Sequence, residues 1–383
     1  MLLKRQGSTL LFFILFSFCG LGLVMLYSAS AFSKEALHAG DSFRFLKNQA
    51  VWLVLGLIAL GVTAFRDYRC WNKNIWWLLG GVVILLALCY VPGIGKRVNG
   101  ANRWLGLGGL TLQPSELAKL ALLLFVSWWY DINQRRVKTF LHGFCIPAAV
   151  CGVVLLLILF EKDVGTTLLL GAVLMILWFA AGVRWQYLVL TMVIAAGGVG
   201  FIVSKDKERL SRLWAHASHG DKMVEKGEGW QQTQSLIALG SGGVEGLGIG
   251  ESRQKLYYLP EAHTDFIFAI IGEELGLRAT LMIVLGFVMY VMIGGYIATR
   301  ASDWQGTLLA LGIVTLVGLQ AFINMGVVTR LLPNKGLALP FISYGGSSLV
   351  VALAMTGWLI SIARHVSTEE ETRWVWRKRE RLT

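Results

Sequence analysis

Charged residues are scarce in this chain of 383 residues: they make up 15%, whereas hydrophobic residues make up 55%. Soluble globular domains usually carry about 25% charged residues, so this composition nearly excludes a soluble enzyme. Proline is also rare, and most of the six prolines punctuate polar segments between apolar runs. The composition therefore predicts a protein that crosses a membrane several times.

Cysteine is sparse as well, with five residues scattered along the chain. Five are too few and too dispersed for a disulfide framework. The Cys and His residues also lack the spacing that zinc ligands require. The sequence therefore identifies no cofactor and no metal ligands, and it leaves a divalent cation open.

Long apolar runs occur throughout the chain. A helix needs about 20 apolar residues to cross the hydrocarbon core of a bilayer. Ten stretches meet this requirement and predict an all-α polytopic membrane protein with a single domain over residues 1–383. The predicted spans are 9–27, 48–65, 75–91, 115–130, 141–160, 165–182, 186–203, 279–299, 306–328 and 344–363.

The loop charges predict the orientation of these spans. Lys and Arg are more frequent in the short loops on the side of the two termini, which places both termini in the cytoplasm together with a basic tail, 364–383. A large loop, 204–278, then lies outside the cell between the seventh and eighth spans. Its basic residues indicate either an anion-facing surface or ordinary solvation and contact with lipid headgroups.

Asp265 is the leading candidate for chemistry, because it stands where a polar cluster opens directly into apolar sequence. Ionised groups at this boundary are costly unless a polar cavity solvates them. A continuous helix would separate Asp265 from Glu273 by about 12 Å, too far for a shared proton. Asp265 would therefore act singly, as a general base. The alternative is an N-cap of the next helix, a role for which Thr264 competes.

Three other polar clusters interrupt the apolar sequence. Glu116 and Lys119 are three residues apart on a predicted helix and can pair, either to line a polar pocket, which we favour, or only to let the helix begin in the membrane. Asp163 lies in a tight turn, where capping the following helix would explain it. Small polar residues in 332–348 permit close helix packing, as an alternative to a functional role. The glycine run 240–250 indicates a flexible loop whose amides could bind a phosphate.

Several segments resemble the SEDS family (shape, elongation, division and sporulation) in the same order along nearly the whole chain. Two segments, Pro260-Glu-Ala-His-Thr-Asp265 and Leu332-Pro-Asn-Lys-Gly336, are more similar to the division branch than to the elongation branch. One departure is Lys162, where family members often carry Pro. The matching segments are 93–105, 113–119, 163–167, 234–243, 259–269 and 339–348.

The resemblance implies a ten-helix peptidoglycan glycosyltransferase that polymerises lipid II on the outer face of the bacterial cytoplasmic membrane, with inversion at the anomeric carbon. Asp265 matches the family's proposed catalytic residue. Arg103, Glu116 and Lys119 match polar positions of its central cavity, where we expect the substrate pyrophosphate to be neutralised. The full set of predicted substrate-binding residues is Arg103, Glu116, Lys119, Asp163, His263, Lys335 and Ser343.

The resemblance also implies partners: a class B penicillin-binding protein, which is a transpeptidase, other membrane proteins of the division machinery, and membrane lipid, but no nucleic acid. It implies a location at the division septum. Two other functions stay open. A lipid II flippase should show paired broken helices near the midplane, and the sequence shows no such pair. A non-catalytic scaffold of the division machinery predicts that Asp265 is dispensable.

Overall fold

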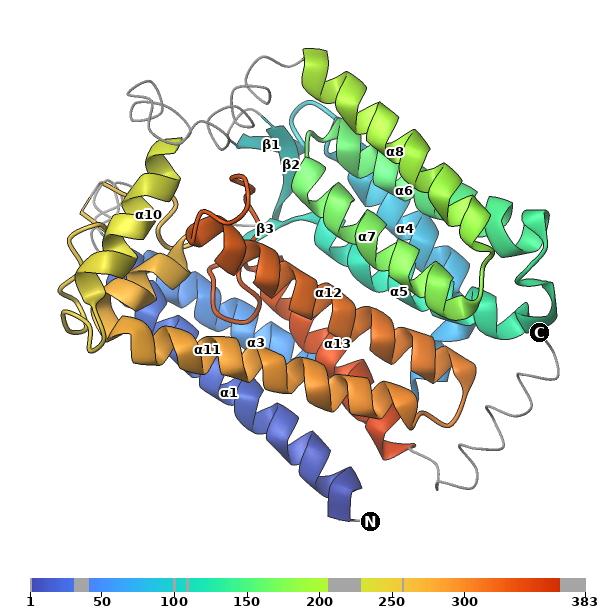
Figure 1. Ribbon diagram of the computed structural model, residues 1–383, viewed down its shortest axis with the longest axis horizontal. Coiled ribbons are helices and arrows are strands. Elements are labelled where there is room, and N and C mark those ends of the chain that lie inside the picture. Colours follow the sequence, from blue (N-terminus) through green and yellow to red (C-terminus); the bar gives the residue numbers. More distant parts are fainter. Residues whose placement is uncertain are drawn as a thin grey trace.

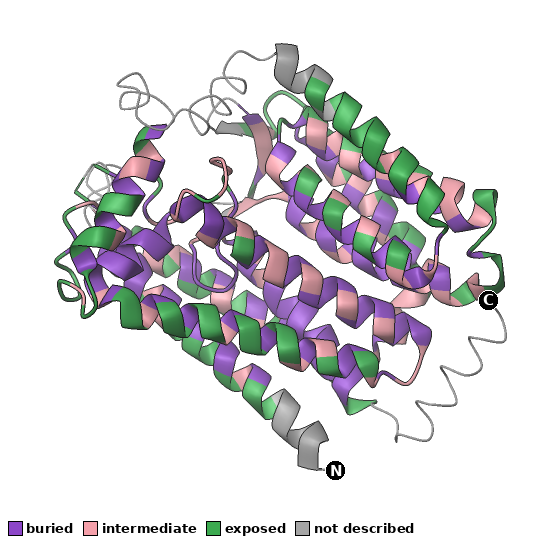
Figure 2. Cartoon of the chain, viewed as in Figure 1, coloured by how far each residue is buried: buried purple, intermediate pink, exposed green. Residues whose placement is uncertain are grey.

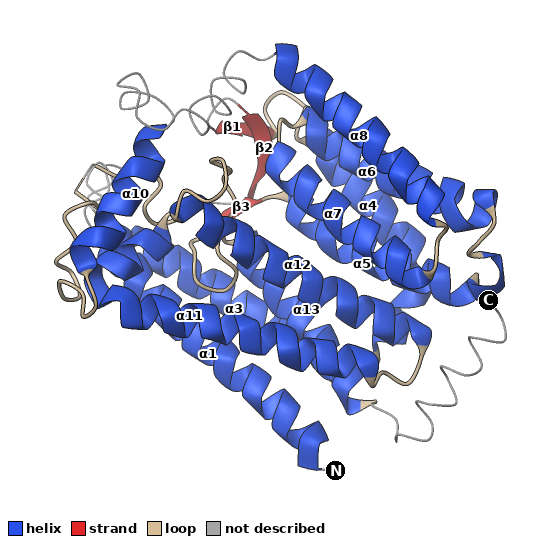
Figure 3. Ribbon diagram, viewed as in Figure 1, coloured by secondary structure: helices blue, strands red, loops and turns tan. Residues whose placement is uncertain are grey.

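The computed structural model describes residues 2–30, 41–98, 101–107, 110–205, 229–256 and 258–365. Helices lie side by side in one bundle, and a small sheet sits at one end of it (Figures 1 and 3). The α-helices are α1 Leu2–Ser30, α3 Arg44–Phe65, α4 Ile75–Leu88, α5 Pro114–Ile132, α6 Ile146–Phe160, α7 Val164–Ala181, α8 Trp185–Lys205, α10 Gly229–Gly242, α11 Ile267–Thr299, α12 Trp304–Val328 and α13 Ser347–Arg364. Short 3-10 helices cover Tyr68–Asn74 and Gln134–Arg136, and a π-helix covers Phe140–Cys145.

Eight helical segments in the described ranges are long and apolar enough to cross a membrane, which makes the chain a multi-pass membrane protein. The described apolar part of α8, Trp185–Gly198, is shorter. Helix α5 carries three charged residues among its 19. The eight segments are Thr9–Ser30, Arg44–Phe65, Tyr68–Leu88, Phe140–Phe160, Val164–Ala181, Ile267–Thr299, Trp304–Val328 and Ser347–Arg364.

Burial differs sharply between the helices. Helices α12 and α13 are mostly buried, whereas α8 and α11 turn exposed apolar side chains outward (Figure 2). On α11 these include Leu281, Leu285 and Met292, each more than half exposed. Such a continuous apolar surface is unfavourable in water and is typical of a helix that faces lipid. The N-terminal end of α1 and the C-terminal end of α13 lie at the same end of the bundle (Figure 1).

A three-stranded antiparallel sheet corrects the all-α prediction. Strands β1 Gly95–Val98, β2 Ala101–Leu107 and β3 Leu110–Leu112 pair in that order. Leu105 of β2 faces both Gly95 and Leu112. The segment mixes charged and apolar residues, and its strands satisfy their backbone groups by pairing with one another.

The large loop is also more structured than predicted. Helix α10 lies within it, and α11 begins at Ile267 rather than near residue 279. Helix α11 is interrupted at Gly276, whose φ of 75° is a left-handed value that glycine adopts without strain. The last helix starts at Ser347 instead of residue 344. Residues 206–228 of the loop and 366–383 of the basic tail lie outside the described ranges.

A buried ion-pair cluster ties this loop to the bundle. Glu274 accepts hydrogen bonds from Ser28 of α1 at 2.7 Å and from the Lys255 ammonium at 2.8 Å. Glu273 accepts from the backbone of Arg253 at 3.0 Å. The amide of Leu247 donates to the Glu273 carbonyl at 2.9 Å, and the amide of Gly248 donates to the Glu274 carbonyl at 3.0 Å. These amides of the glycine run are therefore engaged with α11, and the prediction that they bind a phosphate is wrong for them.

Candidate active site

Asp265 lies in a turn immediately before α11, at the end of the bundle that carries the sheet. The N-cap of α11 is Phe266, and it makes no side-chain capping bond. The Thr264 hydroxyl bonds instead to Glu261, at 2.9 Å from the carboxylate. The alternative role of Asp265 as a helix cap is therefore excluded. Its carboxyl group is half-buried and its backbone carbonyl accepts a bond from Asn324.

The surroundings of Asp265 raise the pKa of its carboxyl group to about 7. Burial is the main cause, because it disfavours the charged form. The negative charges of Glu261 and Asp163 act in the same direction, and the positive charge of Arg103 opposes them. A group that titrates near neutral pH is well suited to take and release a proton.

This pKa predicts the pH dependence of catalysis. A general base works only when it is ionised, so kcat/KM should fall about tenfold per pH unit below pH 7 and level off near pH 8. An Asp with an ordinary pKa, about 3.9, would keep its activity far below pH 6. Turnover rates measured from pH 5.5 to 8.5 will show which holds, and a flat profile down to pH 5.5 would contradict the assignment of Asp265 as a general base.

Glu116 and Lys119 pair in the first turns of α5, as their spacing predicted. The Lys119 ammonium lies 2.7 Å from a Glu116 carboxylate oxygen, and both side chains are buried. Lys119 also donates to Gln320 of α12 at 3.1 Å. Gln320 in turn donates to the carbonyl of Ala338 at 2.8 Å. The pair is therefore linked through α12 to the loop between α12 and α13.

Arg103 of β2 holds the turn between α6 and α7. Its guanidinium donates to the carbonyls of Glu161 at 3.2 Å and Lys162 at 2.6 Å. Asp163 caps α7 by accepting from the Thr166 amide at 3.1 Å, as expected for an N-cap, and its other oxygen accepts from Gln113 at 3.2 Å. Through Arg103, strand β2 thus fixes the turn that carries Asp163, whose negative charge acts on Asp265.

Lys162 determines the shape of this turn. Its φ of 65° is a left-handed value, which costs an ordinary residue about 1 kcal/mol. Lys162→Gly should therefore stabilise the protein slightly. Lys162→Pro should destabilise it by more than about 1 kcal/mol, because Pro fixes φ near −65° and loses the bond from the Lys162 amide to Leu159 at 2.9 Å. Thermal unfolding of both variants in detergent tests this, and a Pro variant as stable as the parent would contradict it.

Glu161, beside Asp163, is a buried carboxyl group that the sequence did not single out. Neither of its side-chain oxygens makes a hydrogen bond of normal geometry. Burial raises the pKa of Glu161 to about 8, and Asp163 adds to the rise. The Cys89 thiol and Arg103 lie close enough to lower it in part. Glu161 is thus largely protonated at neutral pH, which removes one negative charge from the cluster around Arg103.

The remaining predicted residues come from two segments that meet beside Asp265. The His263 ring packs at a tilt against Phe45 of α3, with ring centroids 4.7 Å apart, and the His263 carbonyl accepts from the Tyr344 amide at 3.1 Å. The Ser343 hydroxyl is buried and accepts from the Leu339 amide at 2.9 Å. Lys335 is half-buried in the same loop. Ser343 thus shapes the loop, and its contact with substrate stays a prediction.

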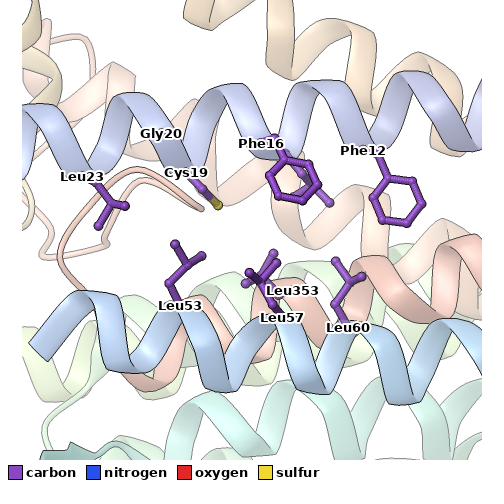
Figure 4. A pocket seen from close by; sticks show the side chains of 10 residues that line it. Phe12, Phe16, Cys19, Gly20, Leu23, Leu53, Leu57, Leu60 and Leu353 are labelled. Atoms are coloured by element: carbon purple, nitrogen blue, oxygen red, sulfur yellow. The ribbon is translucent and has the colours of Figure 1, made fainter.

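The described ranges hold no group of three or more His, Cys, Asp and Glu side chains placed to bind a metal ion. An apolar cavity of about 230 Å³ lies between α1, α3 and α13 (Figure 4). Its lining is aliphatic and aromatic apart from Cys19, so it can receive only apolar groups. Charged groups lie instead near Asp265, where Glu261, Asp163 and Arg103 act on it.

Comparisons with known proteins place this arrangement in a family. A family model described as cell cycle protein, for FtsW, RodA and SpoVE, matches residues 8–368. The chain is a member of the FtsW/RodA/SpoVE family. Membership accounts for the order of the polar segments along the chain, and it agrees with the predicted resemblance.

Within this family, the chain is 43% identical over 343 residues to a probable peptidoglycan glycosyltransferase FtsW of Geobacter metallireducens, covering 89% of the chain and 90% of that relative. It is 36% identical to the stage V sporulation protein E of Bacillus subtilis, covering 94% and 98%. The several relatives named FtsW agree with the predicted likeness to the division branch.

Two solved structures share the fold. One belongs to a peptidoglycan synthase complex described as coordinating polymerisation and crosslinking: its TM-score is 0.74, with 26% identity over 92% of this chain and 96% of that one. The other is the rod shape determining protein RodA of Thermus thermophilus, with a TM-score of 0.68 and 26% identity over 94% and 97%. The bundle with its sheet is thus a RodA-like fold.

Proposed function

We propose that this FtsW/RodA/SpoVE family member is a peptidoglycan glycosyltransferase that polymerises lipid II into glycan strands on the outer face of the cytoplasmic membrane. The observation that carries the proposal is the position of the Asp265 carboxyl group, which caps no helix and lies near the charges of Glu261, Asp163 and Arg103. The neighbouring Glu273 and Glu274 are engaged by the 250–255 segment. A carboxylate beside a membrane surface that caps no helix fits the deprotonation of a sugar hydroxyl.

The reaction then follows from the position of this base. Asp265 takes the proton of the acceptor hydroxyl, and the hydroxyl oxygen attacks the anomeric carbon of the donor. The bond from that carbon to the undecaprenyl pyrophosphate breaks, and the pyrophosphate leaves with the electron pair. Attack from the face opposite the leaving group inverts the anomeric carbon, because a direct displacement forms no covalent glycosyl-enzyme intermediate.

The cations of the site would act on the leaving pyrophosphate. Arg103 is half-buried on β2 and its charge reaches Asp265, so we propose that it faces the pyrophosphate. Lys335 would approach from the loop between α12 and α13. Lys119 is buried against Glu116. We therefore propose that the positive charge of Lys119 acts on the pyrophosphate from a distance, unless bound substrate separates Lys119 from Glu116.

Reconstitution of the purified protein in vesicles tests the function. With lipid II on the outside only, the protein should form glycan polymer, and transfer of labelled lipid II across the bilayer should match protein-free vesicles. Flipping without polymer would favour the flippase. If folded protein supplied with its native membrane partners shows neither polymerisation nor flipping, the result would favour the scaffold.

We propose ten membrane crossings, with α5 and α8 completing the eight apolar spans, and both termini in the cytoplasm. The 204–278 loop then lies outside, where lipid II is polymerised, and the protein works at the division septum. Reporter fusions at both ends and in the loop test the topology. A cytoplasmic signal from the loop would contradict it.

We propose a class B penicillin-binding protein as partner, within an assembly of division proteins, because one structural relative is a synthase complex that couples polymerisation to crosslinking. Helix α11 offers an exposed apolar face, whereas α12 is mostly buried. Photocrosslinkers at Leu281, Leu285 and Met292 should capture the partner, whereas crosslinkers at the buried Ile283 and Phe287 should not. Equal capture from both faces would contradict this surface.

We propose that any divalent cation arrives with the pyrophosphate of the substrate; among the described residues, no group of three or more His, Cys, Asp and Glu side chains is placed to hold one. Chelation should then slow turnover without changing the melting temperature of the substrate-free protein. A stoichiometric metal in the purified protein would contradict this proposal.

A further inference from the structure

We infer that Asn324 is a positioning residue for Asp265: its amide ties the turn that carries Asp265 to the loop that carries Gly336, and so holds the carboxylate in one place. The inference rests on the proposed function, because its kinetic consequence assumes that Asp265 is the base. It assigns Asn324 and Gly336 roles that the sequence alone does not show.

The amide of Asn324 makes two bonds to segments that are distant in sequence. Asn324 lies in the last two turns of α12 and is 2% exposed. Its Nδ2 donates to the carbonyl of Asp265 at 2.8 Å and to that of Leu337 at 2.7 Å. Both amide hydrogens are therefore used. Two hydrogen bonds from one buried side chain fix the two backbones relative to each other.

The loop reaches the carboxylate itself at Gly336. A Cβ atom placed on Gly336 would lie 2.7 Å from Oδ2 of Asp265, closer than van der Waals contact allows. The backbone of the loop thus packs directly against the carboxylate. The φ of Gly336 lies outside the left-handed region that favours glycine, so its backbone accepts alanine, and the added methyl would act through space alone.

Gln320 makes a similar contact with the loop one helical turn before Asn324. It lies four residues before Asn324 on α12 and donates to the Ala338 carbonyl at 2.8 Å. Residues four apart share a helix face, so both amides meet the same stretch of loop. Lys119 bonds to Gln320, whereas only Asn324 of the two bonds to Asp265. Asn324 is therefore the residue whose loss should release Asp265 itself.

Two substitutions separate positioning from general packing. Asn324→Asp keeps the size of the side chain but offers at most one hydrogen to the two carbonyls. Gly336→Ala keeps both bonds and displaces the carboxylate. Because misplacing a catalytic group by about 1 Å can cost up to 100-fold in rate, each should lower kcat by about 10- to 100-fold and change KM less than threefold. Gly171→Ala on α7, where a Cβ meets nothing within 4 Å, is the control.

Hydrogen exchange measured by mass spectrometry gives a readout that does not depend on activity. Asn324→Asp should speed exchange in 261–266 and 336–340, because both segments lose an anchor. Leu308→Ala, on the same helix and fully buried, is the control for a general loss of stability. It should lower the melting temperature without selective change in these two segments.

The pH profile supplies a third readout. Asn324→Leu removes both hydrogen bonds without adding a charge. A loosened turn exposes the carboxyl group of Asp265 to water, so the pKa seen in kcat/KM should fall below 7 in Asn324→Leu but not in Leu308→Ala. Normal kcat and an unshifted profile in folded Asn324→Leu would overturn the inference even if exchange rises. If the parent protein makes no glycan, the proposed function fails. Unchanged hydrogen exchange of 261–266 and 336–340 in Asn324→Asp would by itself overturn the inference that Asn324 holds these two segments together.

Discussion

Asp265→Asn should abolish glycan synthesis and leave a folded, membrane-inserted protein. Asparagine has nearly the size of aspartate but cannot accept a proton, and loss of a general base typically costs a factor of about 10²–10⁴ in rate. The hydrogen bond from Asn324 reaches the backbone carbonyl, so it survives the substitution. Polymer formed by reconstituted protein, together with the melting temperature, measures both parts of the expectation.

Glu261→Gln is the matched control, because Glu261 is an exposed carboxylate in the same turn. Its negative charge contributes to the raised pKa of Asp265. Removing that charge should leave polymerisation active and shift its acid limb to lower pH. Near-normal polymer from a well-folded Asp265→Asn protein would end the assignment of Asp265 as the base.

Lys119→Met should strongly destabilise the protein. It leaves the buried Glu116 without its cation, and breaking a buried ion pair in this way typically costs about 3–5 kcal/mol. Gln320 would also lose its donor. Denaturant or thermal unfolding in detergent should show the loss against the parent protein.

The double variant Glu116→Gln with Lys119→Met separates stability from function. It removes both charges, so most of the lost stability should return. If the double variant is stable but polymerises poorly, Lys119 also serves the substrate. A single Lys119→Met variant as stable as the parent would show that the pair does not stabilise the fold.

Particular residues show which contacts the sequence pattern predicts and which depend on tertiary packing. The pairing of Glu116 with Lys119 and the capping of α7 by Asp163 were both predictable, because each contact spans three residues of one chain segment. The sheet of residues 95–112 was missed, because its strands are short and only their mutual pairing stabilises them. The early start of α11 was missed because Gly276 interrupts it.

The sequence by itself determined the membrane character, the approximate positions of most long helices and the choice of Asp265 as a candidate, because apolar runs and local spacing act within one segment. Only the tertiary structure decided that Asp265 is not a helix cap, that Glu161 is buried beside Arg103, and that Asn324 binds a carbonyl 59 residues away. Such contacts depend on how helices and loops pack together, and no local pattern specifies which distant backbone atom an amide will meet.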